Sequence, residues 1–368
     1  KEPKGRGITQ TLSSSAWALA RLSVSDPDII HKALAEAVSE MRTSMHSPQE
    51  LSILAWACTM LGECDLELSR TLAEQTLVQV RQFKLQELLL VAWSTTAYRS
   101  DVNLSCLIQE EVVSRLQRLD LNSSSEAFWI EFVKITLGVV WAFNISGLLS
   151  DDLLACSRNV LMSKGVSFDF AHSTRSLKGL IGRASACADM SEASMDGLWH
   201  AMQPHIALDL PDRLVINKPA GWEVCNQHTT RQLLTFLKAI SAKQWPILYD
   251  VQCDYGFLHR LDVPSSGLIL AAKTYEAYYD LRVQLSAGGI ARDYVALCHG
   301  WVSPCLGEIS AQVNWRGGLP TSVGGQGKPS HTHLKVLAHA SHRRYALSLL
   351  TIRIRTGRRH QIRSHLSY

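Results

Sequence analysis

Hydrophobic residues in the first half of the chain recur at the spacing of a helix face. One such stripe is formed by Leu51, Leu54, Ala55, Cys58 and Leu61. A second, earlier stripe is formed by Ile30, Ala33, Leu34, Ala37, Val38 and Met41. Between them, the segment Ser47-Pro48-Gln49-Glu50 has the form of a capping box with proline at the first helical position. The pattern predicts paired amphipathic helices.

Tryptophan recurs along this helical part in similar surroundings. TLSSSAWALARL, ELSILAWACTML and ELLLVAWSTTAY contain Trp17, Trp56 and Trp93, and GVVWAF adds Trp141. A degenerate copy without tryptophan falls around residues 177–184. One helical hairpin cannot bury its own apolar face, so such units stack on their neighbours. We therefore predict an all-α helical-repeat solenoid over residues 1–205, with its tryptophans in the core.

The repeated Leu-to-Trp-Ala-Leu-Ala core resembles the octotricopeptide-type repeats of algal organelle proteins. That family binds RNA, so the resemblance implies an RNA-binding arm and an organelle such as the mitochondrion or plastid, with the cytoplasm as the alternative. A protein-interaction scaffold is the other interpretation of such an array. The sequence leaves the choice between RNA and a protein partner open.

The pattern changes after residues 204–220, which contain three prolines. The β-rich runs that follow are residues 214–216, 267–272, 294–298, 308–313, 333–337 and 345–354. Two helical stretches, residues 230–242 and 274–285, lie among them. This order predicts an α+β domain over residues 206–368, with a mixed, mainly antiparallel sheet.

Charge separates the two parts of the chain. Residues 1–209 carry 18 basic and 24 acidic side chains, whereas residues 210–368 carry 19 basic and 9 acidic ones. Residues 343–368 contain seven arginines and no acidic residue. The second part is therefore expected to meet a polyanion. The longest apolar stretch, residues 132–143, is shorter than a membrane span, and the nine cysteines form no CxxC pair, so neither a membrane partner nor a metal site is expected.

Five segments of the second part follow one another in a diagnostic order. They are DRLVINKPAGWEV (212–224), LHRLDVPSSGLILAAKT (258–274), ARDYVALCHGWV (291–302), GKPSHTHLKVL (327–337) and IRTGRRHQIRSHL (354–366). In this order they resemble the RluA-type pseudouridine synthases. The resemblance implies an isomerase that needs no cofactor and converts uridine to pseudouridine in rRNA, tRNA or mRNA. Members of that family continue past the last motif, so we expect the domain to be truncated.

The resemblance assigns the chemistry to three residues. Asp262 takes the place of the catalytic carboxylate, which can start the reaction by attacking covalently or by removing a proton, and both routes stay open. Arg363 would hold that carboxylate ionised and oriented. Tyr294 would stack on the detached base and serve in proton transfer.

Six further residues are implied in binding RNA or the substrate. The target base must leave the stack, and Arg260 with His259 would fill the vacated space. The others are Lys218, Arg358, His360 and Gln361, from the first and last motifs. The rival hypothesis is a non-catalytic RNA-binding or protein-interaction scaffold that retains the synthase motifs.

Overall fold

The computed structural model describes residues 13–20, 26–61, 66–98, 102–121, 125–179, 203–225, 229–241, 244–315, 321–324, 327–342 and 345–368. The chain forms two compact units. The first contains Lys1–Ser114, Gly138–Ser150 and Ala287–Tyr368, and the second contains Arg115–Leu137 and Asp151–Ser286. Each unit therefore contains both helical N-terminal residues and residues of the β-rich part, and each is described by itself.

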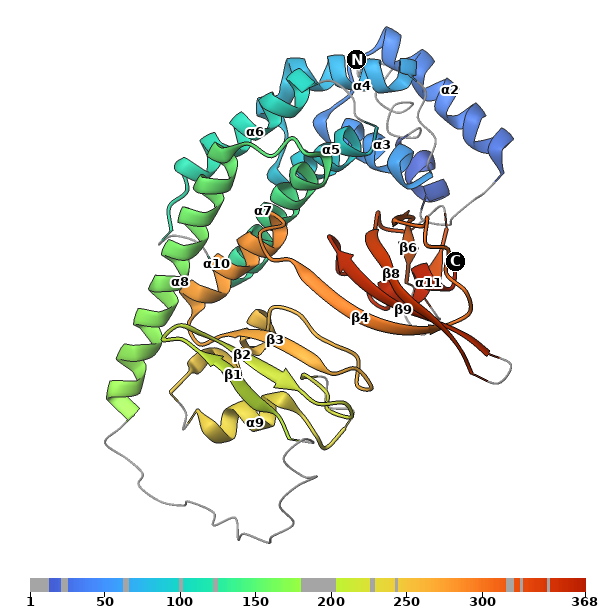
Figure 1. Ribbon diagram of the computed structural model, residues 1–368. Coiled ribbons are helices and arrows are strands. Elements are labelled where there is room, and N and C mark those ends of the chain that lie inside the picture. The colour runs from blue at the N-terminus through green and yellow to red at the C-terminus, as the bar shows by residue number, and fades with distance from the viewer. Residues whose placement is uncertain are drawn as a thin grey trace, which may run out of the picture. The chain divides into compact units, whose positions relative to one another are not determined.

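The N-terminal region, from residue 13 to residue 172, is helical (Figure 1). After a helix at residues 13–20, its elements are α2 (Pro27–Thr43), α3 (Pro48–Leu61), α4 (Leu66–Gln79), η1 (Val80–Gln82), α5 (Leu85–Tyr98), α6 (Val102–Gln117), α7 (Glu126–Ser146) and α8 (Asp151–Gly179). The predicted capping box starts α3: the Glu50 amide donates to Ser47 Oγ, and the Ser47 amide donates to Glu50 Oε2 at 2.8 Å. Leu51, Leu54 and Cys58 of the predicted stripe are buried, as expected.

The recurring tryptophans occupy alternate helices. Trp56 lies on α3, Trp93 on α5 and Trp141 on α7, and the rings of Trp93 and Trp141 are 5.0 Å apart. These three are half-buried, and Trp17 is 46% exposed. The prediction that the tryptophans are core residues is therefore wrong for Trp17, and the smaller alanines and leucines around the others occupy the core instead. The solenoid arrangement of the units stays a prediction, and most of the degenerate copy near residues 177–184 lies outside the described residues.

Helix α7 is long and apolar enough to cross a membrane by length and composition alone. The run is longer than the stretch at residues 132–143 that the sequence singled out. Half of its most apolar window is buried inside the protein. Val139, Val140 and Phe143 have no exposed surface, which is the pattern of a helix that packs in a protein core.

In the second unit, three antiparallel strands form a sheet in the order β1-β2-β3. They are β1 (His205–Asp209), β2 (Arg213–Lys218) and β3 (Gly267–Ala272). The helices of this part are α9 (Leu233–Ile240), η3 (Pro246–Tyr249), η4 (Val251–Gly256) and α10 (Tyr275–Ser286). Leu214 and Ile216 of β2 and Ile269 of β3 form the core with the leucines of α9. The β2–β3 register pairs Lys218 with Gly267, which sets the end of β2 beside the start of β3.

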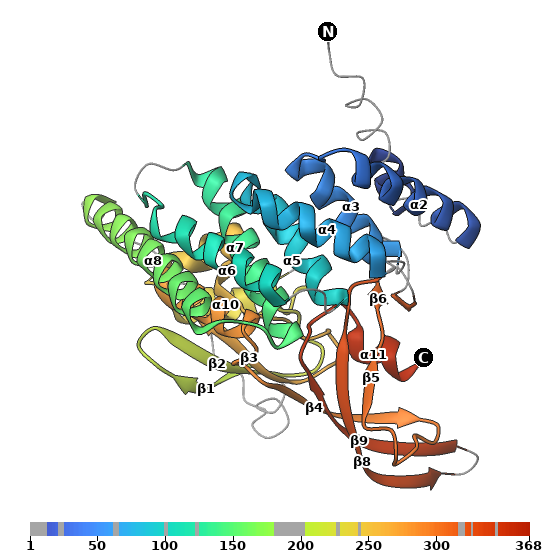
Figure 2. The same ribbon diagram turned by 90° about the horizontal axis from the view of Figure 1, so that it is seen from above.

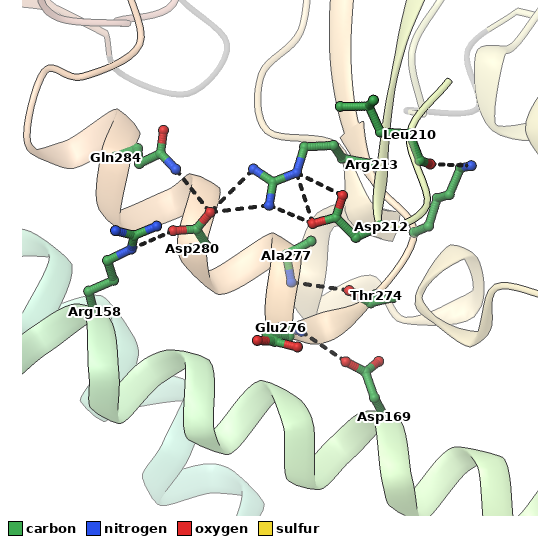
Figure 3. Close-up of polar contacts among 11 residues, drawn as sticks. Arg158, Asp169, Leu210, Asp212, Arg213, Thr274, Glu276, Ala277, Asp280 and Gln284 are labelled. Carbon is green, nitrogen blue, oxygen red and sulfur yellow. Dashed lines mark hydrogen bonds and ion pairs between the residues drawn. The ribbon is translucent and has the colours of Figure 1, made fainter. Parts of the chain in front are cut away.

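Helix α8 of the helical region packs against α10 in this unit (Figure 3). Asp169 accepts hydrogen bonds from the first amides of α10, those of Tyr275 at 2.9 Å and Glu276 at 3.0 Å. These amides have no partner inside their own helix, so a carboxylate from α8 caps α10. A Cβ on Gly165 would lie 2.5 Å from Glu276 Cα. The helices therefore approach so closely at this point that only glycine fits.

A buried carboxylate joins three elements of the second unit (Figure 3). Asp280 of α10 is 3% exposed and accepts from Arg158 of α8 at 2.7 Å and from Arg213 of β2 at 3.2 Å. Gln284 donates to it at 2.9 Å. Arg213 also pairs with Asp212. A buried charge is tolerated only when it is paired, and here the pairing fixes α8, α10 and β2 to one another.

The C-terminal part of the first unit is a twisted antiparallel sheet in the order β4-β9-β8-β5 (Figure 2). Its strands are β4 (Arg292–His299), β5 (Glu308–Ser310), β8 (His331–His342) and β9 (Tyr345–Ile354), and β6 (Val313–Asn314) pairs with β7 (Ser322–Val323). Leu334, Leu350 and Ile352 form its core, against which α11 (Gln361–Leu366) packs through Ile362 and Leu366.

The predicted elements of the second part are largely confirmed. The strands at residues 267–272 and 345–354 have the predicted bounds, α9 lies in the first predicted helical stretch, and α10 is shifted by one residue from the second. The expected strand at residues 308–313 is instead divided between β5 and β6, and the described strands form three sheets rather than one. The named strand pairs are antiparallel, as expected.

Candidate active site

Asp262 lies in a turn between the segment at residues 257–258 and strand β3. The Ser265 amide donates to the Asp262 carbonyl at 3.0 Å, which closes the turn. On its N-terminal side the chain is tied to β3, because the Leu258 amide donates to the Leu270 carbonyl at 3.1 Å. Asp262 itself is half-buried. Its carboxylate is thus carried by a short loop whose two ends are fixed to the same strand.

Lys218 at the end of β2 supports this loop from within the protein. Its residue surface is 0% exposed, and its Nζ donates to the carbonyls of Trp222 at 2.7 Å, Pro219 at 3.1 Å and Val263 at 3.3 Å. The Gly221 amide donates to the same Val263 carbonyl at 2.8 Å. Burial lowers the pKa of the Lys218 ammonium, and the charge of Asp262 opposes that decrease. Lys218 therefore binds the chain one residue beyond Asp262 and attracts its carboxylate.

His259 and Arg260 precede Asp262 on the same loop and differ in exposure. The Leu270 amide donates to His259 Nε2 at 3.4 Å, so this nitrogen acts as the acceptor and the ring is held against β3. Arg260 is exposed. Of these two residues, Arg260 has its side chain available at the surface beside Asp262.

Tyr294 lies on β4 in the first unit. It packs against the buried cluster of Leu334 and Ile352, and it lines a hollow of about 590 Å³. Lys335, Arg353 and Arg355 share that hollow with His333 and with Asp293, which pairs with Arg353. An aromatic ring beside Lys and Arg side chains is a combination that binds single-stranded nucleic acid.

Arg363 lies on the short helix α11 and is exposed. With His360 it lines a second hollow of about 520 Å³, whose wall carries hydroxyls from Thr321, Ser322 and Ser364. His360 has a φ of 52°, in the left-handed region, and its Nδ1 lies 3.3 Å from Thr321 Oγ1. A non-glycine residue rarely adopts this conformation, and strain of this kind is concentrated at functional sites.

Gln361 has a different environment from its neighbours. It is 2% exposed, and its Nε2 donates to the His331 carbonyl at 3.1 Å and to Thr332 Oγ1 at 3.0 Å. Its Oε1 accepts from Thr356 Oγ1 at 2.8 Å and from the Arg358 amide at 3.1 Å. These bonds use its whole amide group, so Gln361 fixes the start of α11 to β8.

Arg358 is packed against an aromatic ring from the helical region. Its guanidinium carbon lies 4.5 Å from the centroid of Trp141 on α7. Burial lowers its pKa to about 10, and the nearby charge of Arg292 adds to that decrease. Sequence reasoning did not find Trp141 or Arg292 as parts of this site, because each would be an ordinary core or surface residue if judged alone.

The described residues contain no group of three His, Cys, Asp or Glu side chains that could hold a metal ion. The structure brings the predicted residues together in two sets. Lys218, His259, Arg260 and Asp262 lie in the second unit, and Tyr294, Arg358, His360, Gln361 and Arg363 lie in the first.

Comparison with known proteins finds relatives of the C-terminal part. Residues 212–368 match the sequence profile of the family described as RNA pseudouridylate synthase. Ribosomal large subunit pseudouridine synthase D of Nitrosomonas europaea is 32% identical over 239 residues, which are 61% of this chain and 66% of that protein. An uncharacterised RNA pseudouridine synthase of Bacillus subtilis is 32% identical over 186 residues, which are 48% of this chain and 57% of that protein.

The similarity to solved structures is lower. The human protein RNA pseudouridylate synthase domain containing 1 aligns with 48% of this chain and 67% of its own, with 24% identity and a TM-score of 0.36. The chain spans less than two thirds of the length of the two bacterial relatives.

Proposed function

We propose that this protein converts uridine to pseudouridine in RNA and that Asp262 is the catalytic carboxylate. The observation that carries the proposal is the mounting of Asp262 on a loop fixed to β3 and held from within by Lys218. The buried ammonium of Lys218 binds the Val263 carbonyl beside the partly exposed carboxylate and so keeps that carboxylate in place. The match of residues 212–368 to the synthase family supports the same assignment.

The reaction needs few participants. The bond between uracil N1 and the sugar C1′ breaks, the base turns, and a bond between C5 and C1′ forms. N1 gains a proton and C5 loses one, so atoms and charge balance without a cofactor. Asp262 would start the reaction at the sugar, either as a nucleophile or as a base.

Tyr294 and Arg363 complete the proposed machinery by resemblance to the family. In this proposal Arg363 pairs with the Asp262 carboxylate, and Tyr294 stacks on the detached uracil and serves in proton transfer. Both residues line hollows, and each hollow also contains basic or hydroxyl side chains. This environment suits a polyanionic substrate with hydrogen-bonding groups.

Basic residues around these hollows would bind the RNA. Arg260 and His259 would enter the space that the flipped base leaves, and His360 and Arg358 would contact the RNA. Lys218 and Gln361 would act through the backbone, because both are buried and their polar atoms bind neighbouring residues. For the helical region, we propose that residues 1–205 form an octotricopeptide-like solenoid that serves as an RNA- or protein-binding arm.

The proposal is tested by separating binding from chemistry. RNA labelled with tritium at C5 of uridine is incubated with the full chain, because pseudouridine formation releases that hydrogen to water. We expect release by the unmodified protein and none by Asp262→Asn, which should still bind the RNA. Equal release by both proteins would overturn the assignment of Asp262, and no release by either would favour the non-catalytic scaffold.

A further inference from the structure

Two arginines of the first unit lie side by side, and no described carboxylate is paired with them. Arg292 begins β4, and its Nη2 donates to the Arg355 carbonyl at 3.4 Å. A Cβ on Gly357 would collide with Arg292 Nη1, so the guanidinium lies directly on the backbone that leads into Arg358. Burial lowers the pKa of Arg358, and the positive charge of Arg292 lowers it further.

Neither guanidinium has all its donors satisfied by the described part of the chain. The Nε atoms of Arg292 and Arg358 are buried and have no hydrogen-bond partner among the described residues. Within the same residues, no carboxylate forms an ion pair with either arginine. Arg358 makes a weak bond from Nη2 to the Pro329 carbonyl at 3.5 Å. Adjacent, desolvated like charges destabilise the folded protein unless an anion joins them.

Two more side chains lie near this pair of arginines. The guanidinium carbon of Arg358 lies 4.5 Å from the ring centroid of Trp141 on α7, so the ring makes a cation–π contact with this arginine. Lys328, an exposed residue, adds a third cation. Desolvation of its ammonium lowers its pKa, and the charge of Arg358 lowers it further. Elsewhere in the same unit an arginine at the surface has its acid, since Arg353 binds Asp293 through two bonds of 2.6 Å.

We propose that Arg292, Arg358 and Lys328, braced by Trp141 of the helical region, form a binding site for a phosphate group. A planar guanidinium offers paired donors that match phosphate oxygens, and a phosphate would offset the mutual repulsion of the cations. Both arginines are half-buried, so the site is partly open to solvent. The phosphate belongs either to the RNA backbone or to a free phosphate ester, and in the first case the inference rests on the proposed function.

The first arm of the test measures RNA binding across a range of salt concentrations. The full chain is compared with Arg292→Gln and with a matched control, Arg70→Gln, whose arginine lies on α4 with a side chain that is 79% exposed. For a single-stranded oligonucleotide we expect Arg292→Gln to reduce the salt slope by about 0.7 for each phosphate that the variant no longer neutralises. We expect roughly tenfold weaker binding at low salt, which corresponds to one charge-assisted hydrogen bond fewer. The control variant Arg70→Gln should have the same salt dependence of RNA binding as the unmodified protein.

The second arm uses inorganic phosphate as the probe. Thermal unfolding is followed with phosphate replacing chloride at constant ionic strength, and we expect the midpoint of the full chain, but not of Arg292→Gln, to rise. A reduced RNA slope assigns the site to the RNA backbone, whereas phosphate protection with an unchanged RNA slope assigns it to a free phosphate ester. An Arg292→Gln protein that matches the unmodified chain in both arms overturns the site.

Three further variants control for misfolding and test the contribution of the helical region. Arg292→Lys keeps the charge and should keep most of the salt slope. Trp141→Phe keeps a ring and should bind like the unmodified protein, whereas Trp141→Leu should weaken binding. Unchanged binding by Trp141→Leu in both arms overturns the role of the helical region. No readout here depends on pseudouridine formation, so this site and the proposed activity can fail separately.

Discussion

Lys218 Nζ donates to the carbonyl of Val263, the residue that follows Asp262, at 3.3 Å. The lysine is fully buried, and its other two bonds go to the carbonyls of Pro219 and Trp222. A single ammonium therefore ties the turn after β2 to the loop that carries the candidate catalytic carboxylate. This arrangement assigns Lys218 a positioning role.

Replacing this lysine should separate catalysis from RNA binding. Lys218→Met keeps the length of the side chain but leaves the carbonyls of Pro219 and Trp222 without this donor, while that of Val263 keeps the Gly221 amide, and we expect a loss of about 2 kcal/mol of stability. The loop around Asp262 loses its support, so we expect kcat to fall while the affinity for RNA stays within twofold. Single-turnover rates and RNA titrations with the same protein check this. A parallel decrease in RNA affinity would show instead that Lys218 contacts the RNA.

Substituting the buried Asp280 should destabilise the protein more than substituting Arg158, its partner on α8. Asp280→Asn leaves Arg213 partly uncompensated in the interior, and we expect a loss of about 3 kcal/mol. Arg158 has a side chain that is 49% exposed, so Arg158→Gln should cost less than about 1 kcal/mol. Urea unfolding of both variants measures the difference. Similar losses in the two proteins would contradict the dominant role of the Asp280–Arg213 pair.

Gly165→Ala should weaken the packing of α8 against α10, although alanine favours a helix more than glycine does. Alanine is preferred over glycine in a helix by about 1 kcal/mol. At Gly165 the new Cβ would meet the backbone of Glu276, so we expect Gly165→Ala to destabilise the protein by about 2 kcal/mol through overpacking. Gly307→Ala is the control, because no atom lies within 4 Å of its added Cβ. A stabilising effect of Gly165→Ala would refute this close approach of the helices.

His365 should make the stability of the first unit depend on pH. It is 1% exposed, its Nδ1 lies 2.9 Å from Thr332 Oγ1, and its Nε2 lies 3.1 Å from the Ala311 carbonyl. Burial lowers its pKa below the usual value, so the unfolded chain binds the proton more readily than the folded one. The stabilisation is complete above the unfolded pKa of about 6.5 and is lost as the pH falls through the lower folded value.

The measurement compares urea unfolding at about pH 7.5 and about pH 5.5, on either side of the unfolded pKa. We expect the unmodified protein to lose more stability on acidification than His365→Gln does. Equal losses would mean that His365 does not contribute to the pH dependence.

Local sequence patterns were enough to predict most of the secondary structure. The capping box at Ser47 and the strand at residues 345–354 depend on neighbouring residues, and both are confirmed. The split of residues 308–313 into β5 and β6 depends on two different pairing partners, β8 and β7, which alternation along one segment does not reveal. Likewise, Asp169 caps a helix that begins 106 residues later in the chain.

The roles of the candidate site residues were harder to predict. The resemblance grouped Gln361 and Lys218 with the RNA-binding residues, but burial and hydrogen bonds can make a polar residue structural, and these depend on tertiary packing. Arg358 was named from its motif, whereas its ring partner Trp141 comes from a helix 217 residues earlier. The roles proposed for Asp262, Tyr294 and Arg363 stay predictions that only activity measurements can test.

The central claim is that the chain makes pseudouridine with Asp262. RNA is incubated with the full chain, digested to nucleosides and separated by chromatography before mass spectrometry, since the two isomers have equal mass. We expect a pseudouridine peak for the unmodified protein and for Asp152→Asn, an exposed aspartate on α8 that serves as the control, and no peak for Asp262→Asn. A pseudouridine peak of undiminished size from Asp262→Asn would contradict the claim.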